Sequence, residues 1–126
     1  MLPCAGHVEG SNVGRMIDLD DAASAELNHM PASADQVVDG SPTVGYLLLG
    51  EFSGHEYGIW EMSPGAMWDI EEDELFVVIS GHGVVEHAAD ATKTVLSPGV
   101  VVRLTAGART TWTISETLRK VWMTPL

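Results

Sequence analysis

Short apolar runs separated by turn residues fill the chain from Gln36 onward, and the most apolar of them is Leu75–Ile79. A charge cluster precedes this run, and Gly81-His82-Gly83 follows it. A short apolar run with such boundaries is typical of a strand that is buried on both faces. The pattern therefore predicts a strand over Glu74–Ser80, in which Glu74 leads into the interior.

Further strands are predicted at regular spacing on both sides of this one. The Ser-Pro-Gly sequences at 63–65 and 97–99 are typical of turns, and an acidic loop is expected between Gly65 and Glu74. The predicted strands are Val37–Val38, Thr43–Leu49, Tyr57–Met62, Glu74–Ser80, Gly83–His87, Thr92–Leu96, Val100–Leu104, Thr110–Ile114 and Thr117–Met123. Turns every 8–12 residues indicate an all-β sandwich or barrel.

Residues 1–35 do not share this pattern and are predicted to form an irregular N-terminal arm. The segment Ile17–Met30 is compatible with one or two helical turns, with Asp20 or Asp21 as N-cap and Pro31 after the end. The arm is expected to pack over a sheet edge or a neighbouring subunit, or to be disordered at its extreme end. The predicted division is an arm over 1–35 and one domain over 36–126.

The charge balance restricts the possible partners. The chain has 18 acidic and 6 basic residues, which give a net charge of −12. Without a basic stripe, neither nucleic acid nor an anionic membrane is an expected partner. Cys4 is the only cysteine, so neither a disulfide framework nor a thiolate zinc site is predicted. With no signal-peptide pattern and no long apolar run, the protein is expected to be cytoplasmic.

Several short motifs occur in an order that is more specific than any one of them. They are Gly58-Ile59-Trp60-Glu61, Pro64-Gly65, Asp73-Glu74, the strand that ends at Gly81, Pro98-Gly99, Gly107, Trp112 and Arg119-Lys120. Over residues 36–124 this order resembles a small single-domain cupin of the branch related to ureidoglycine aminohydrolase and ethanolamine-utilisation cupins. The resemblance implies a double-stranded β-helix, also called a jelly-roll barrel, with an internal pocket and a homodimeric assembly. Many members of this branch have no assigned function.

The chain departs from the superfamily pattern at the positions of the metal ligands. The resemblance places the carboxylate ligand at Glu74, followed after six residues by Gly81. The two preceding histidine positions fall on Met67 and Asp69, or on Trp68 and Ile70 with the shorter spacing, and the third falls on Thr110. None of the five histidines occupies a ligand position, so each is expected at the surface. The sequence predicts neither a transition metal nor another cofactor.

Two residues are candidates for catalysis. Glu74 is either a pocket carboxylate that acts as a general base or binds an amine, or a solvated carboxylate at the rim. Lys120 alternates with Leu118 and Trp122, so its stem lies on an apolar face. It either pairs with a partner such as Glu74 or extends to solvent.

Five other residues are candidates for substrate binding. Asp69 and Thr110 point inward if the register of the motif holds. Met67 and Trp68 either line the pocket or pack in the core or rim. Arg103, on the strand face opposite Val102, either anchors a substrate carboxylate or faces solvent. Core or interface packing is expected for Trp60 and Trp112.

These observations favour a small cupin that binds or transforms a small, nitrogen-containing metabolite without a transition metal. In the enzyme interpretation Glu74 carries the proton, and Lys120, Arg103 or Thr110 orients the substrate. The alternatives are a non-catalytic metabolite-binding or accessory protein and a structural dimer with a vestigial pocket. An open cavity that brings Glu74, Lys120 and Asp69 together would favour one of the first two, and a barrel filled by Met67, Trp68 and Phe76 would favour the third.

Overall fold

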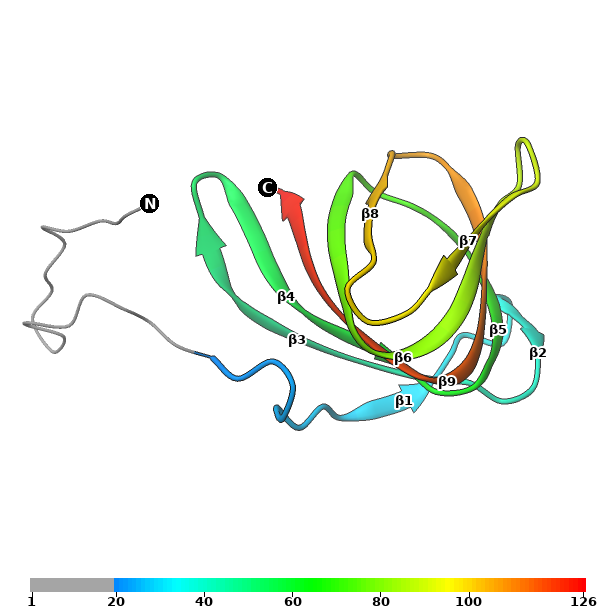
Figure 1. Ribbon diagram of the computed structural model, residues 1–126, viewed down its shortest axis with the longest axis horizontal. Coiled ribbons are helices and arrows are strands. Elements are labelled where there is room, and N and C mark those ends of the chain that lie inside the picture. The colour runs from blue at the N-terminus through cyan, green and yellow to red at the C-terminus, as the bar shows by residue number, and fades with distance from the viewer. Residues whose placement is uncertain (1–19) are drawn as a thin grey trace, which may run out of the picture.

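The computed structural model describes residues 20–126, which form nine β-strands joined in one curled antiparallel sheet (Figure 1). The strands are β1 (His29–Pro31), β2 (Val37–Asp39), β3 (Thr43–Phe52), β4 (His55–Met62), β5 (Gly65–Ile70), β6 (Glu74–His87), β7 (Thr92–Leu96), β8 (Val101–Leu104) and β9 (Arg109–Pro125). The curled sheet has the all-β architecture of a cupin jelly roll, which confirms the predicted fold class.

The long strand β9 organises the sheet. The C-terminal half of β9 pairs with β4, its N-terminal half pairs with β5, and β6 pairs along most of its other edge. Beyond these contacts, β3 and β1 extend the sheet past β4, β2 extends it past β5, and β7 and β8 pair with β6. Because β6 and β9 curve together, the sheet encloses one interior face (Figure 1).

The core lies on this interior face. Its fully buried side chains include Met62, Phe76, Val78, Leu96 and Leu118, from four different strands. Leu118 pairs with Met62 across β4 and β9, and Lys120 pairs with Val78 across β6 and β9. Residues directly opposite in an antiparallel pair share a face. The core residues and Lys120 therefore lie on the same side of the sheet.

Two expected turns are absent from the described strands. Glu74–Ser80 and Gly83–His87 belong to one strand, β6, and Thr110–Ile114 and Thr117–Met123 belong to one strand, β9. The pairing of β6 with β9 shifts register between Val78 and Gly83, as in a β-bulge. Gly81 adopts φ +88° there, and a side chain at this position would collide with the carbonyl oxygen of Thr117. The glycines bend a continuous strand instead of ending it.

The prediction of an acidic loop between Gly65 and Glu74 was also wrong in part. Residues Gly65–Ile70 form β5, and only 71–73 connect it to β6. Alternation puts Met67 and Asp69 on one face, since they pair with Trp112 and Thr110 of β9, and puts Trp68 and Ile70 on the other face. The apolar and aromatic residues of β5 supply enough pairing and burial to extend the strand into the acidic segment.

The described part of the N-terminal arm contains one turn at 22–24, followed by β1. The helix that was predicted up to Met30 is therefore wrong at its end, where β1 begins. The Asp21 carboxylate accepts a hydrogen bond from the backbone N–H of Ala23 at 3.1 Å. Strand β1 pairs with residues 43–45 of β3, so this part of the arm joins the sheet edge. Residues Ile17–Leu19 of the predicted helix lie outside the described residues. The division at residue 35 stays a prediction.

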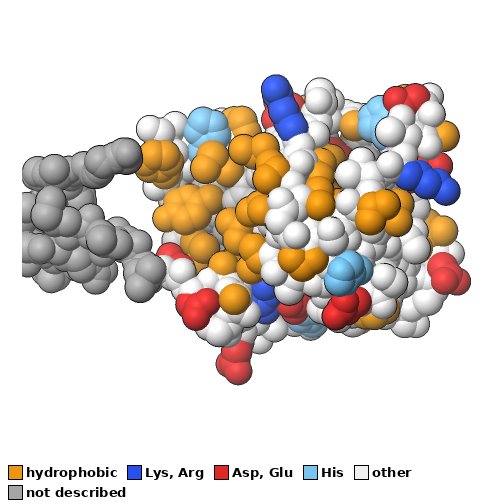
Figure 2. All heavy atoms as spheres, in the orientation of Figure 1, with side chains coloured by type: hydrophobic (Ala, Val, Ile, Leu, Met, Phe, Trp, Pro, Cys, Tyr) orange, Lys and Arg blue, Asp and Glu red, His pale blue; other side chains and the backbone are white. Residues whose placement is uncertain are grey.

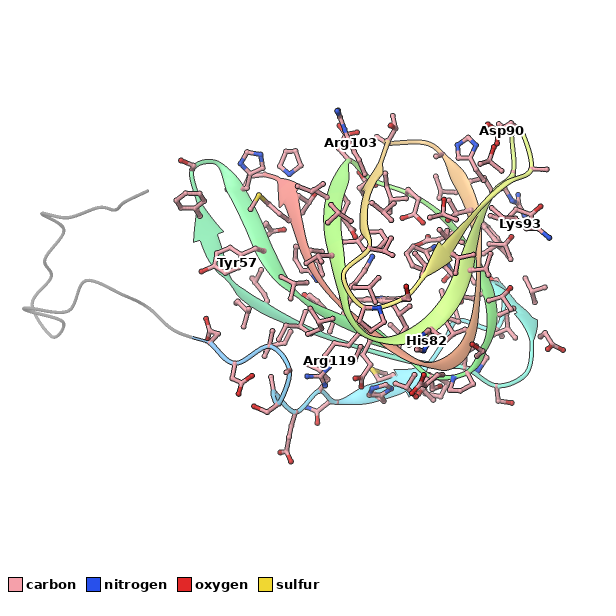
Figure 3. The ribbon with its side chains drawn as sticks, in the orientation of Figure 1. Tyr57, His82, Asp90, Lys93, Arg103 and Arg119 are labelled. Atoms are coloured by element: carbon pink, nitrogen blue, oxygen red, sulfur yellow. The ribbon has the colours of Figure 1, made fainter. Side chains whose placement is uncertain are left out.

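A cluster of charged side chains holds the arm to the outer face of the sheet. Arg119 donates a hydrogen bond from Nε to Glu61 at 2.9 Å and from a terminal nitrogen to the carbonyl oxygen of Ala22 at 2.8 Å. His29 contacts the other oxygen of Glu61 at 2.6 Å. Arg119 points from the sheet toward the segment that leads into β1 (Figure 3).

Candidate functional site

A cavity of about 290 Å³ opens on the interior face of the curled sheet. Side chains from β3, β4, β5, β6 and β9, together with the connection after β5, line it. They are Tyr46, Trp60, Met67, Asp69, Glu71, Glu72, Glu74, Trp112, Lys120, Trp122 and Thr124. The cavity is thus an acidic and aromatic one, and it contains both candidate catalytic residues.

Lys120 and Glu74 form an ion pair in this cavity. The Lys120 side chain is buried, with the residue 5% exposed, and its Nζ lies 2.5 Å from Oε2 of Glu74. Three ring centroids surround the same nitrogen, those of Phe76 at 4.3 Å and of Trp60 and Trp112 at 4.7 Å each. A carboxylate and aromatic faces both attract an ammonium group. Of the two predictions for Lys120, the structure shows the one in which it is buried and paired with Glu74, not the one in which it extends to solvent.

Glu71 is a buried carboxylate that the sequence interpretation treated as part of the loop. It is 6% exposed, and its Oε2 accepts hydrogen bonds from the Thr110 hydroxyl at 2.5 Å and from the Trp112 indole N–H at 2.9 Å. Glu71 follows Met67 and Asp69 at every second position, so a strand through this segment would predict that Glu71 also points inward. The prediction of a loop over 66–73 excluded this interpretation.

Asp69 lies beside Glu71 at the cavity wall. Its Oδ1 accepts hydrogen bonds from the backbone N–H of Ile70 at 2.8 Å and from the side-chain amide of Gln36 at 3.3 Å. Burial raises the pKa of the Asp69 carboxyl above its ordinary value of 3.8, and the negative charge of Glu71 raises it further. Asp69 therefore holds its proton to a higher pH in the folded chain than in the unfolded chain.

The aromatic residues serve both the core and the cavity. Trp112 is buried in the core, and its ring centroid lies 5.3 Å from that of Trp60 and 5.6 Å from that of Phe76. Trp122, two residues after Lys120 on β9, also lines the cavity, and it pairs with Gly58 of β4. A side chain at Gly58 would come within 2.7 Å of the Trp122 ring. Glycine at position 58 thus leaves room for the Trp122 ring.

Three sequence candidates lie outside the cavity lining. Trp68 faces the other side of β5, where its indole N–H bonds to the carbonyl oxygen of Asp35 at 3.0 Å and Arg109 stacks on its ring. Thr110 is buried, and its hydroxyl donates a hydrogen bond to Glu71, which does line the cavity. Arg103 is an exposed residue of β8 (Figure 3), and it lines a separate hollow that shares only Glu74 with the cavity.

Met67, Asp69, Glu74 and Lys120 are therefore the predicted site residues that the structure brings together around one cavity. Of the histidines, His7 lies outside the described residues. His29, His82 and His87 contact carboxylates, and His55 contacts the Ser53 carbonyl oxygen. None of these four histidines lines the cavity.

The donors present do not fit the metal centre that the cupin resemblance implies. The ligand positions on the interior face hold the Met67 thioether, the Asp69 carboxyl and the Thr110 hydroxyl, and the fourth ligand, Glu74, is paired with an ammonium. Imidazole, the ligand that suits iron, nickel or zinc, is missing from this set. Within residues 20–126, no three His, Cys, Asp or Glu side chains gather in a metal-binding arrangement. The prediction of a metal-independent site stays a prediction.

The described residues contain no helix with the length and apolar character needed to cross a membrane. A search of the curated proteins gives no match to this sequence.

Solved structures with the same fold include two proteins named EutQ. The EutQ protein of Clostridium difficile is 20% identical, with a TM-score of 0.59 over 74% of this chain and 78% of that one. A putative ethanolamine utilization protein Q from Salmonella typhimurium is 13% identical, with a TM-score of 0.56 over 79% of this chain and 95% of that one. A protein of unknown function from Pseudomonas syringae is 22% identical, with a TM-score of 0.65 over 86% of this chain but 46% of that one.

These similarities support the fold, and the sequence itself supports the family. The profile of the EutQ-like cupin domain matches residues 49–122, which include β4, β5, β6, β7 and β8, most of β9 and all of the cavity lining except Tyr46 and Thr124. The chain belongs to the EutQ-like cupin family.

Proposed function

We propose that the cavity binds a small, nitrogen-containing metabolite in its cationic form, without a transition metal. The observation that supports this most directly is the charge of the cavity wall. It carries four acidic residues, Asp69, Glu71, Glu72 and Glu74, and one basic residue, Lys120. After Glu74 is neutralised by Lys120, the remaining carboxylates favour a positively charged ligand.

The size and composition of the cavity support a small ligand. A volume of about 290 Å³ is near the lower end of the range for ligand sites, which suits a metabolite of few heavy atoms. The aromatic walls of Tyr46 and Trp122 would contact its apolar part. The combination of an open cavity with Asp69, Glu74 and Lys120 counts against the alternative of a vestigial pocket in a purely structural protein.

Acid–base catalysis is a second candidate for the same cavity. It is favoured by the raised pKa of Asp69, which prepares this carboxyl for proton transfer closer to neutrality, and by the fixed ion pair of Glu74 with Lys120. In this function Asp69 or Glu74 would exchange a proton with the bound substrate, while Lys120 would orient it. The accessory, non-catalytic function needs only the binding step.

Matched small molecules test the proposed binding. Propylammonium, 1-propanol and propionate differ in charge and have similar size, and each is titrated by calorimetry and by thermal shift at neutral pH. The ammonium compound is expected to bind, and at 100 times its dissociation constant it should add about 2.7 kcal/mol to the free energy of unfolding. The Glu116→Gln variant, which removes a charge from the exposed partner of His82, should bind it equally well. Binding of propionate in preference to propylammonium would overturn the proposal.

We also propose that the protein is cytoplasmic and acts as a homodimer. Strand β3 supports the dimer, because residues 46–52 pair only with β4 among the described strands and carry exposed apolar side chains. Figure 2 shows hydrophobic side chains gathered over β3, β4 and the end of β9. An unpaired, apolar edge of this kind is a typical site of strand-to-strand association.

A further inference from the structure

The ammonium group of Lys120 occupies the aromatic part of the cavity. Its Nζ lies within 4.7 Å of the ring centroids of Trp60, Phe76 and Trp112, and Glu74 pairs with it from the fourth side. Three rings and a carboxylate around a cation form the kind of box that recognises quaternary ammonium ligands in other proteins. Here the box is filled by a side chain of the chain itself.

Two carboxylate oxygens of residues that line the cavity receive no hydrogen bond within residues 20–126. Oδ1 of Asp69 and Oε2 of Glu71 each accept two hydrogen bonds, whereas residues 20–126 supply no donor to Oδ2 of Asp69 or to Oε1 of Glu71. Glu71 is only 6% exposed, so a carboxylate oxygen on it that lacks a donor is costly. Both residues line the cavity, next to each other at the end of β5.

These two observations restrict the chemistry of the ligand. A primary ammonium group has three N–H donors that it can offer to carboxylate oxygens of this kind. A quaternary ammonium group has no N–H donor and depends on aromatic faces, which Lys120 already covers. The cavity is therefore expected to favour a primary ammonium ion over a quaternary ammonium ion of the same charge.

We propose that Lys120 is a specificity-determining residue: it fills the box of Trp60, Phe76, Trp112 and Glu74, so the cation of the ligand is a primary ammonium bound by Asp69 and Glu71. This inference rests on the proposed binding of a cationic metabolite and names its class. It also gives the ion pair a role, since Glu74, which the cupin resemblance places at a metal-ligand position, here binds the ammonium group of Lys120.

The test compares propylammonium with tetramethylammonium in the wild type and in variants at Lys120. The wild type is expected to bind propylammonium at least about tenfold more tightly, because only this cation has N–H donors for the carboxylate oxygens of Asp69 and Glu71. Lys120→Ala empties the box but leaves its rings and Glu74, so this variant should gain at least about tenfold in affinity for tetramethylammonium. Lys120→Met removes the charge and keeps the box filled, so it is the matched control that should not gain this affinity.

Asp69→Asn and Glu71→Gln in the wild-type background complete the test and do not depend on the stability of the Lys120 variants. Asp69→Asn should weaken propylammonium binding by about tenfold or more. Equal binding of both cations by the wild type, or unchanged propylammonium affinity in both carboxylate variants, would overturn the inference and leave the proposed function standing. A folded Lys120→Ala variant that binds no tetramethylammonium would also overturn it. Failure of the wild type to bind either cation would overturn the proposed function itself.

Discussion

Nζ of Lys120 lies 2.5 Å from Oε2 of Glu74, and their side chains are 6% and 18% exposed. Lys120 is on β9 and Glu74 begins β6, so the pair joins the two longest strands at the inner face of the sheet. Burying two charges together is tolerable because each satisfies the other, whereas either one alone would be strongly unfavourable. The pair is therefore both a structural link and the electrostatic centre of the cavity.

Removing one partner of this pair should destabilise the protein. Lys120→Met is expected to lower the free energy of unfolding by about 3 kcal/mol, because it leaves the Glu74 carboxylate without its cation in a largely buried position. Glu74→Gln should have a smaller effect, since the three rings still attract the ammonium group. The measurement is urea denaturation of both single variants and the double variant. Strictly additive effects in the double variant would show that the two side chains are not coupled.

Asp69 should make stability depend on pH. A carboxyl with a raised folded-state pKa binds its proton more tightly in the native chain than in the unfolded chain. Its contribution to the free energy of unfolding is therefore complete below its pKa in the unfolded chain, near 3.8. This contribution is lost as the pH rises through its pKa in the folded chain. The charged groups that face Asp69 are Glu71 and Glu74, which raise its pKa, and Lys120, which lowers it.

Asp69→Asn removes this ionisation, so its stability relative to the wild type should increase as the pH rises from about 4 to about 8. Urea denaturation of both proteins across this range measures the difference. Because the unprotonated carboxylate is the form that attracts an ammonium ligand, propylammonium affinity of the wild type should rise over the same range. A stability difference that is constant with pH would contradict the raised pKa.

Much of this architecture was predictable because the inward face of each strand is marked by apolar residues. The alternation of Leu118, Lys120 and Trp122 was enough to place the stem of Lys120 on the interior face, and Glu74 was its natural partner at the start of the buried strand. The same reasoning placed Arg103 opposite Val102 and Leu104, and it does face away from them. The predictions for Lys120 and Arg103 thus depended only on the alternation of residues within one strand.

The parts that could not be predicted depend on contacts distant in sequence. Gly81 looked like the end of a strand, but pairing with β9 continues on both sides of the bulge. Glu71 looked like a solvated loop residue, and it is buried because Thr110 and Trp112, about 40 residues later, supply its hydrogen bonds. A single sequence does not indicate which polar residue will find such partners.

The bulge at Gly81 yields a prediction with a matched control. Gly81 and Gly99 both adopt positive φ, at +88° and +96°. A side chain at Gly99 meets nothing within 4 Å, whereas one at Gly81 collides with the backbone at Thr117 and Leu118. Gly99→Ala should therefore cost about 1 kcal/mol for its backbone conformation alone, and Gly81→Ala should cost about 3 kcal/mol or more. Similar melting temperatures for the two variants would contradict this account.

The outer cluster of Arg119, Glu61 and His29 should control the attachment of the arm. Burial acts to raise the pKa of the Glu61 carboxyl, but hydrogen bonds from Arg119 and His29 bring it below its ordinary value of 4.5. Arg119→Met removes the bonds to Glu61 and to the Ala22 carbonyl.

We expect this variant to increase amide hydrogen exchange over residues 22–31 by at least about tenfold, since a charged hydrogen bond contributes about 1.5–3 kcal/mol. The variant Arg103→Met is the control and should leave exchange in this segment unchanged. Equal protection in both variants would show that β1 is held by its pairing with β3 alone.

The free edge of β3 leads to the last prediction, which concerns assembly. Light scattering should give a homodimer of about 27 kDa, twice the 13.5 kDa of one chain. Leu48 is 44% exposed on the part of β3 that pairs only with β4 within the described sheet. A lysine there would place a charge at an edge that needs apolar contact to associate, so Leu48→Lys should shift the mass to that of the monomer. Val95 on β7 is more exposed, at 68%, and Val95→Lys should leave the dimer intact because it lies on a different edge. A wild-type monomer at micromolar concentration would exclude the dimer, and dissociation by Val95→Lys but not by Leu48→Lys would move the interface from β3 to β7.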